Sequence, residues 1–338
     1  MNREERQDDR ARQSRRGFLR RSVGAALAAG LAHPARLMSQ AISAASTSTG
    51  DSHEALARVV RVTSDRVMPL RVVHRNILTD ALNEGLRLLT GKSRIADAWH
   101  ALLDPRDVIL LKFNQSAAER LGTTQAAAEV LVESLVKAGW NPSQLMLLEA
   151  GDMTGDLLRQ TRRPDRRWQG TLVNFGESGS DSFIAALDEA TAIINVPFLK
   201  THHLATMTSC MKNLSHGLIR TPARFHANGC DPAIAEIVHS PQIRDKLRLN
   251  VVNALRVMAH TGSKADGEVV ETAGTILLGA NPVSCDAVGF GLLNEVRSLR
   301  SFPPLLKHAA LPRQIITAER LGLGTADLER IEMPLIKL

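Results

Sequence analysis

Short apolar stretches alternate with amphipathic ones through most of the chain. The apolar stretches, which we predict to be strands, are residues 107–113, 145–150, 191–196, 247–257 and 275–278. The amphipathic stretches, which we predict to be helices, are residues 75–89, 93–103, 124–138, 182–189, 282–296 and 312–321. Strands that are apolar throughout and separated by helices belong to sheets that are covered on both faces. The pattern predicts an α/β fold: a mainly parallel (mixed) sheet with helices on both faces.

The same patterns divide the chain into three segments. Residues 1–45 are rich in arginine and have the features of an export signal. Residues 46–104 begin with Ser and Thr and continue with helical patterns, as expected for a linker and N-terminal helices. Residues 105–338 hold the alternating strands and helices, which predicts the α/β domain. The last strand-like piece of this domain, residues 330–338, is expected to form an edge of the sheet.

The first segment resembles a twin-arginine export signal. Residues 14–20 read S-R-R-G-F-L-R, and a weakly apolar stretch from Val23 to Ala32 follows. This stretch is too short for a permanent transmembrane helix. Small residues then offer cleavage after Ala41 or after Ala45. We therefore expect transport by the Tat translocase to the periplasm or another extracytoplasmic space.

Charge and composition argue against nucleic acid as a partner. The formal net charge is +7, but residues 1–45 hold nine arginines against four acidic residues, so most of the excess belongs to the leader. Tyr is absent and aromatic residues make up 3% of the chain, which leaves few platforms for base stacking.

The cysteines limit the possible cofactors. Cys210, Cys230 and Cys285 are the three cysteines of the chain, and none forms a C-x-x-C pair. The number and spacing of the cysteines therefore argue against an iron–sulfur cluster and against a disulfide framework. The cofactor is left open.

Polar residues follow three of the predicted strands. Lys112 and Asn114 end the first, Glu149 and Asp152 end or follow the second, and the third runs from Asn195 to Lys200, Thr201 and His202. The carboxyl ends of parallel strands meet at one edge of a sheet, where such folds bind ligands. We therefore expect these groups to line one groove.

The segment from Leu204 to Gly217 has helical spacing. Its apolar positions are Leu204, Met207, Met211 and Leu214. Its polar positions on another face are Ser209, Lys212, Asn213 and His216. A helix that begins near Leu204 would point its amino end, together with Lys200, at a phosphate or carboxylate.

A metal site is the alternative for the same region. The possible ligands are His202, His203, His216, His226, Cys230 and Asp231. Two features argue against it. The Asn228–Gly229 pair predicts a turn that separates His226 from Cys230, and adjacent histidines on an extended chain point apart. We therefore assign no residue as a metal ligand at this stage.

Several segments resemble the Domain of Unknown Function 362 family. The block I-I-N-V-P-F-L-K-T-H-H-L followed by M-K-N-L is similar to the family's signature. Further similar segments are residues 108–114, 147–152, 281–288 and 322–332, so that the resemblance covers about residues 105–335. Relatives that carry four-cysteine clusters connect the family to redox chemistry, but this chain lacks those cysteines. It also has Asn281 where the family usually has Asp.

These observations favour an exported enzyme that acts on or with an anionic small molecule or cofactor. Lys112, Lys200 and Lys212 are expected to hold the anion, with hydrogen bonds from Asn114, Asn195, Thr201 and Asn213. Glu149 or Asp152, together with His202, are the candidates for acid–base catalysis. Asp286 lies in the first turn of a predicted helix, where either a capping or a catalytic role fits. The alternative is a non-enzymatic protein that binds a ligand or metal, or accompanies an exported redox partner.

Overall fold

A nine-stranded mixed sheet forms the centre of the computed structural model, which describes residues 56–261 and 267–338. The predicted export signal, residues 1–45, lies outside the described residues. The strands are β1 Ala57–Arg58, β2 Val60–Thr63, β3 Ile109–Lys112, β4 Leu145–Leu148, β5 Val173–Asn174, β6 Ser180–Asp181, β7 Ala192–Asn195, β8 Phe198–His202, β9 Thr206–Thr208, β10 Leu247–His260, β11 Val269–Gly279, β12 Ile331–Glu332 and β13 Leu335–Lys337. The α-helices are α2 Arg75–Thr90, α3 Ile95–His100, α4 Ala118–Leu121, α5 Thr124–Lys137, α6 Asp156–Arg159, α7 Ala186–Glu189, α8 Cys210–Ser215, α9 Ala233–His239, α10 Pro241–Arg244, α11 Pro282–Ser298 and α12 Arg313–Arg320.

The strand order of the main sheet is β13-β2-β11-β10-β7-β3-β4. Strands β10, β7, β3 and β4 are parallel neighbours, whereas β11 runs antiparallel to both β10 and β2. β8 pairs in parallel with the outer part of β10, and β9 pairs antiparallel with β8. The predicted α/β class, with a mainly parallel mixed sheet, is therefore confirmed.

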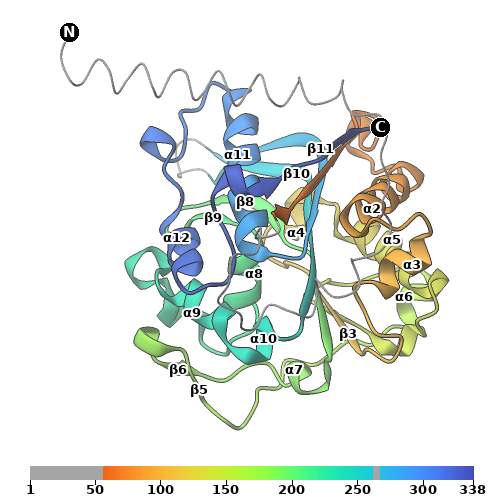
Figure 1. Ribbon diagram of the computed structural model, residues 1–338, viewed down its shortest axis with the longest axis horizontal. Helices are drawn as coiled ribbons and strands as arrows, with labels where there is room; N and C mark the ends of the chain where they lie inside the picture. The colour runs from red at the N-terminus through yellow and green to blue at the C-terminus, as the bar shows by residue number, and fades with distance from the viewer. Residues whose placement is uncertain (1–55, 262–266) are drawn as a thin grey trace. The chain divides into compact units, whose positions relative to one another are not determined.

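Helices cover both faces of this sheet (Figure 1). α2, α3 and α5 lie on one face, and α8, α9, α11 and α12 lie on the other. The alternation of side chains along each strand divides them between the two cores. In β3, Ile109 and Leu111 pack with the α2/α5 core, while Leu110 packs with the α8/α11 core. Lys112 has the same parity as Leu110 and therefore faces α8.

Residues 56–104 contribute to the same compact unit as the rest of the described chain. β2 pairs with β11 and with β13, which forms an edge of the sheet as predicted. α2 packs over β2 and β11. The segment expected to precede the α/β domain thus supplies one of its inner strands and part of its helical cover. In the described part of the chain, no helix is long and apolar enough to span a membrane.

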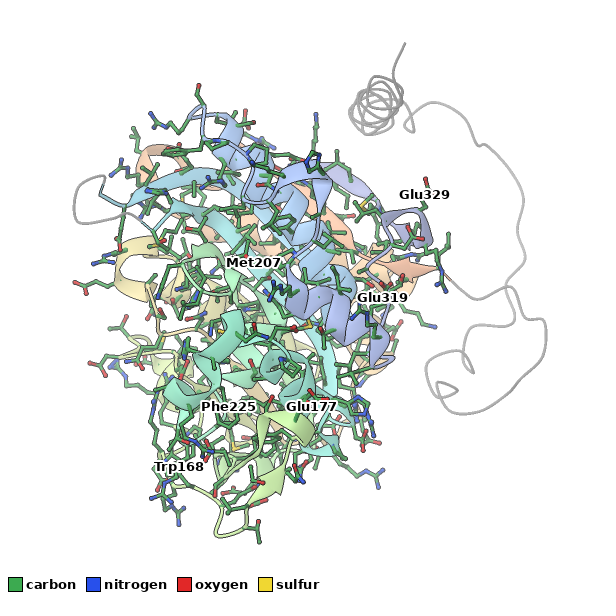
Figure 2. All side chains as sticks on the ribbon, turned by 90° about the vertical axis from the view of Figure 1, so that its left-hand side faces the viewer. Trp168, Glu177, Met207, Phe225, Glu319 and Glu329 are labelled. Atoms are coloured by element: carbon green, nitrogen blue, oxygen red, sulfur yellow. The ribbon has the colours of Figure 1, made fainter. Side chains whose placement is uncertain are left out.

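The helix predicted from Leu204 to Gly217 is wrong in its first half. The structure has a turn and the strand β9 there, and α8 begins only at Cys210. His202 Nδ1 accepts the backbone N–H groups of Leu204 and Ala205, both at 3.1 Å, and this contact fixes the turn. Leu204 is 44% exposed, whereas Met207 lies in the interior (Figure 2). The helical spacing arose because Met207 of the strand and the apolar residues of α8 enter the same core.

Candidate functional site

Lys112 lies at the carboxyl end of β3 and is fully buried. Its ammonium group donates to Phe113 O at 2.6 Å, Glu149 Oε2 at 3.0 Å and Asn213 Oδ1 at 3.0 Å. A lysine ammonium has three hydrogens, and these three acceptors use all of them. Burial lowers the pKa of Lys112, while the charge of Glu149 opposes that shift. Lys112 therefore has no donor left for a ligand.

A chain of asparagines continues from Lys112 across the sheet edge. Asn213 of α8 donates to Lys112 O at 3.2 Å and to Asn195 Oδ1 at 2.8 Å. Asn195 donates in turn to Cys210 O at 3.1 Å and to Asn250 Oδ1 at 2.9 Å. Asn250 ends the chain on the carbonyls of Gly279 and Ala280. This network connects β3, β7, β10 and β11 to α8, and a fully satisfied network of this kind rigidifies its surroundings.

Glu149 holds the other end of the network. Its oxygens accept hydrogen bonds from Lys112 at 3.0 Å and Arg166 at 2.8 Å. The backbone of Glu149 has a φ of 57°, which is uncommon for a residue with a side chain and persists only where the surroundings hold it. The geometry thus gives Glu149 the place of an ion-pair partner. Lys112, Asn195, Asn213 and Glu149 meet as predicted, but they bind one another.

Gly217 is required by this arrangement. A Cβ atom at position 217 would lie 2.7 Å from Lys112 Cε and 2.7 Å from Asn213 O, and it would also overlap Lys112 Nζ. Gly217→Ala is therefore expected to lower the free energy of unfolding by about 1–3 kcal/mol through overpacking. Chemical denaturation measures this change, and Gly291→Ala, where a Cβ atom would meet nothing within 4 Å, is the control. Equal stability of both variants would contradict the tight packing around Lys112.

The remaining predicted residues lie at separate places. Asp152 is exposed. Asn114 is 6% exposed, and Thr201 donates to Met258 O inside β8 and β10. Asp286 is buried and accepts the backbone N–H groups of Cys210 at 2.6 Å and Met211 at 3.1 Å, so it caps α8. Asn281 accepts from the Ser284 N–H group at 2.9 Å and caps α11, a role that its amide can fill.

A second group of side chains, which we call the basic cluster, lies beside this network. Its members are Lys200, His202, His203, Lys212, His216 and His226. Lys200 and His202 face the same side of β8, because side chains two residues apart on a strand share a face. The register Lys200↔Thr208 places Thr208 of β9 on that side as well. The Thr208 hydroxyl is buried and has no hydrogen-bond partner among the described residues.

The two lysines of the basic cluster differ from Lys112. Lys200 is 8% exposed and donates to Ser116 Oγ at 3.1 Å, and Lys212 is 7% exposed and lies 3.4 Å from His226 Nε2. In the described part of the chain, neither lysine forms an ion pair with a carboxylate. Burial lowers both pKa values, that of Lys212 to about 8. Buried charges in proteins are normally paired, so the lack of an ion pair sets these two lysines apart from Lys112.

Three histidines of the basic cluster, His202, His216 and His226, are held neutral. Burial, together with the charges of Lys212 and Lys200, lowers the pKa of His202 to about 3. Burial also lowers the pKa values of His216 and His226. The rings of His202 and His203 stack with their centroids 4.9 Å apart. The expectation that these two rings point apart is therefore wrong, because His203 already lies in the turn after β8.

Sequence reasoning missed three contributors to the site. Arg166 is the second cation that donates a hydrogen bond to Glu149. The Ser116 hydroxyl accepts a hydrogen bond from Lys200, and Asn250 extends the asparagine chain. The signal for Asn250 was an amide inside an otherwise apolar strand, where an unpaired polar group is costly. Arg166 and Ser116 lie in loops and left no such signal.

Comparisons with known proteins agree with the resemblance seen in the sequence. Residues 166–291 match the family model described as Domain of unknown function (DUF362). No curated protein sequence matches the chain. Among solved structures, the chain is similar to the lactate racemase apoprotein from Thermoanaerobacterium thermosaccharolyticum, at 11% identity and a TM-score of 0.43. That likeness covers 72% of this chain and 58% of the other, and it assigns no activity. The family model thus confirms the resemblance for residues 166–291, a segment that contains every residue of the basic cluster.

Proposed function

We propose that the protein binds an anionic small molecule, a carboxylate or a phosphate, at the basic cluster. One observation carries the proposal: Lys200 and Lys212 are buried, and neither forms an ion pair with a carboxylate of the described residues. Glu268, whose charge acts on Lys200, is itself paired with Arg120. The buried hydroxyl of Thr208, on the same face as Lys200, supplies a further hydrogen-bonding group. Ammonium groups are strong partners for oxyanions in such a poorly hydrated place.

His202 is the residue of the cluster that fits a catalytic role, as a hydrogen-bond donor. Its Nδ1 accepts two backbone N–H groups, so the neutral ring carries its proton on Nε2. A neutral imidazole N–H near two ammonium groups can polarise a carbonyl or phosphoryl oxygen of the bound anion. This geometry favours His202 as a hydrogen-bond donor, whereas the sequence predicted a role in acid–base catalysis.

The binding proposal predicts a loss of affinity in Lys200→Met. Removing one charge-assisted hydrogen bond should weaken binding roughly tenfold or more. The full chain is titrated with inorganic phosphate and with oxalate, and binding is measured by calorimetry and by the shift in Tm. An anion at a hundred times its Kd should stabilise the wild type by about 2.7 kcal/mol.

Two comparisons make this experiment decisive. Lys92→Met removes an exposed lysine and should leave binding unchanged. Lys200→Met itself should fold normally, because Lys200 forms no ion pair and the nearby Glu268 keeps its own ion pair with Arg120. The proposal fails if neither anion stabilises the wild type, or if the Lys92 and Lys200 variants bind equally well.

Export through the twin-arginine pathway remains part of the proposal. It is supported by the S-R-R-G-F-L-R motif at residues 14–20 and the apolar stretch after it. Cell fractionation of the wild type and of the double variant Arg15→Lys/Arg16→Lys tests it. The non-enzymatic alternative uses the same basic cluster and differs in needing no turnover of the bound anion.

A further inference from the structure

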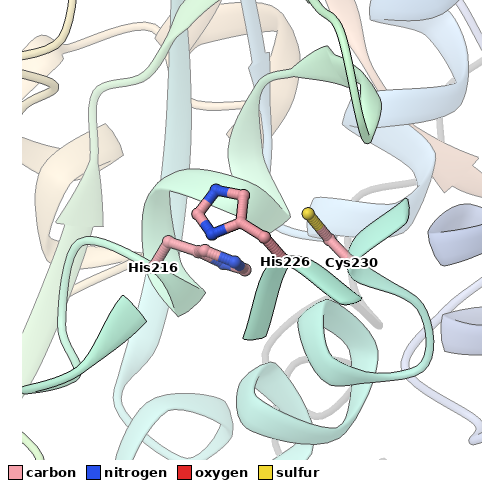
Figure 3. Close-up of side chains that lie close together, drawn as sticks. All are labelled: His216, His226 and Cys230. Carbon is pink, nitrogen blue, oxygen red and sulfur yellow. The ribbon is translucent and has the colours of Figure 1, made fainter. Parts of the chain in front are cut away.

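Two histidines of the basic cluster converge with Cys230 as potential metal ligands (Figure 3). His216 follows α8, and His226 and Cys230 belong to the 3-10 segment Pro222–Cys230. One ligand atom from each lies within 4.8 Å of the other two. Zn–N and Zn–S bonds of about 2.0–2.3 Å place tetrahedral ligand atoms about 3–4 Å apart. A movement of about one ångström therefore closes the set around an ion.

The turn at Asn228–Gly229 is present, as the sequence predicts, with φ angles of 51° and 71°. It was expected to separate His226 from Cys230. Instead it brings the chain back, so that the Cys230 sulfur lies near both imidazoles. The argument against a metal site from this turn is therefore wrong, because it considered only helical spacing.

Each histidine has one ring nitrogen fixed on a backbone carbonyl. His226 Nδ1 donates to Pro222 O at 3.0 Å, and His216 Nε2 donates to Phe225 O at 3.2 Å. In the neutral rings, the lone pairs are then on Nε2 of His226 and Nδ1 of His216. The Ser215 hydroxyl lies 3.1 Å from His216 Nδ1, and it has Lys212 O at 3.3 Å as another acceptor when a metal takes that nitrogen. Metal-binding histidines characteristically make such a second hydrogen bond, which fixes the tautomer and the orientation of the ring. Two carbonyls thus prepare both rings as ligands.

A cation already contacts one of these ligands. Lys212 Nζ lies 3.4 Å from His226 Nε2, and the ligand atoms of His216, His226 and Cys230 lie within 4.8 Å of one another. The ammonium group therefore lies next to the whole set. The lysine stem is flexible, so the ammonium can leave this position when another cation takes it.

We propose that His216, His226 and Cys230 form a binding site for a borderline divalent transition metal such as Zn²⁺, which takes the place of the Lys212 ammonium. Nitrogen and sulfur ligands select zinc and similar ions over magnesium and calcium. The Cys230 thiol gives its proton to solvent when the metal binds. Three protein ligands leave a fourth position open, beside the proposed anion site.

Cobalt titration tests the proposal with a signal that only sulfur ligation gives. The full chain, stripped with a chelator, is titrated with Co²⁺ and then with Zn²⁺. We expect one equivalent of Co²⁺ to produce a thiolate-to-cobalt charge-transfer band, which Zn²⁺ then removes. Cys230→Ser should abolish the band, and His226→Ala should weaken binding by at least about 10- to 100-fold. His74→Ala, which changes an exposed histidine outside the site, is the control.

Lys212→Met gives the sharper result, because its two expected effects have opposite signs. Metal affinity should rise on the order of tenfold or more, since the ion no longer displaces an ammonium group. Anion binding should fall, since one of the two buried charges is gone. This variant also decides the matter if Cys230→Ser fails to fold.

The outcomes separate the two proposals. A wild type that binds phosphate or oxalate but gives no thiolate-to-cobalt band overturns the metal site alone. A band that appears without any anion binding overturns the proposed function alone. A band that persists in folded Cys230→Ser, or a weaker metal affinity in folded Lys212→Met, also overturns the metal site.

Discussion

Replacing Glu149 by alanine is expected to lower the free energy of unfolding by about 3–5 kcal/mol, the usual cost of leaving a buried charge without its partner. The charge in question is the ammonium of Lys112, which is fully buried and has Glu149 as its only described carboxylate partner. Its two other acceptors, Phe113 O and Asn213 Oδ1, carry no charge to balance it. Urea denaturation of the full chain measures the change.

A surface ion pair provides the matched control for Glu149→Ala. Arg58 and Glu332 lie 2.7 Å apart, with both side chains partly exposed. Glu332→Ala should therefore cost less than about 1 kcal/mol. If the two alanine variants lose the same stability, Lys112 does not depend on Glu149, and the interpretation of this network as structural is wrong.

Asp286→Ala is expected to have the second largest effect, a loss of about 2–4 kcal/mol. The change leaves the backbone N–H groups of Cys210 and Met211 buried without an acceptor, and each such group costs about 1–3 kcal/mol. Because these groups begin α8, the helix that carries Lys212 should loosen as well. Hydrogen exchange of the two amides, together with the melting temperature, measures both consequences. Unchanged protection of the two amides would contradict the capping role.

The same carboxyl predicts a pH dependence of stability. Burial raises the pKa of Asp286 to about 6, and the backbone N–H groups of Met211 and Cys210 oppose the shift. Because the folded-state pKa lies above the unfolded value, protonation of Asp286 stabilises the folded protein. This stabilisation is complete below about pH 4 and is lost as the pH rises through about 6. Over this window, the wild type should lose up to about 3 kcal/mol relative to Asp286→Asn. Parallel stability profiles of the two proteins would refute this.

Most strands and long helices followed from the sequence because their patterns are local. The apolar run at residues 107–113 predicted a covered strand, and the helix predicted at residues 124–138 ends within one residue of α5. β9 could not be found in this way. Its turn depends on a ring nitrogen of His202 that accepts two backbone N–H groups, and no hydrophobic period records such a contact.

The sequence predicted where the candidate site lies, but not which of its residues bind one another and which remain available for a ligand. The carboxyl-edge rule brought Lys112, Glu149 and Asn195 together correctly. It could not show that Asn213, about a hundred residues after Lys112, would use up the last lysine donor. Nor could the spacing of His226 and Cys230 show that a turn would return the chain towards His216. The Asn213–Lys112 contact and the return of the chain towards His216 both depend on long-range packing. The same packing separates the internal network from the basic cluster.

Anomalous diffraction from crystals soaked in selenate tests the central claim most directly, because selenium marks the place where a tetrahedral oxyanion binds. The claim is that Lys200 and Lys212 hold an anion and Lys112 does not. It predicts an anomalous peak within hydrogen-bonding distance of the ammonium groups of Lys200 and Lys212, which is lost in Lys200→Met crystals. Selenate peaks confined to surface arginines, with none at the basic cluster, would contradict it.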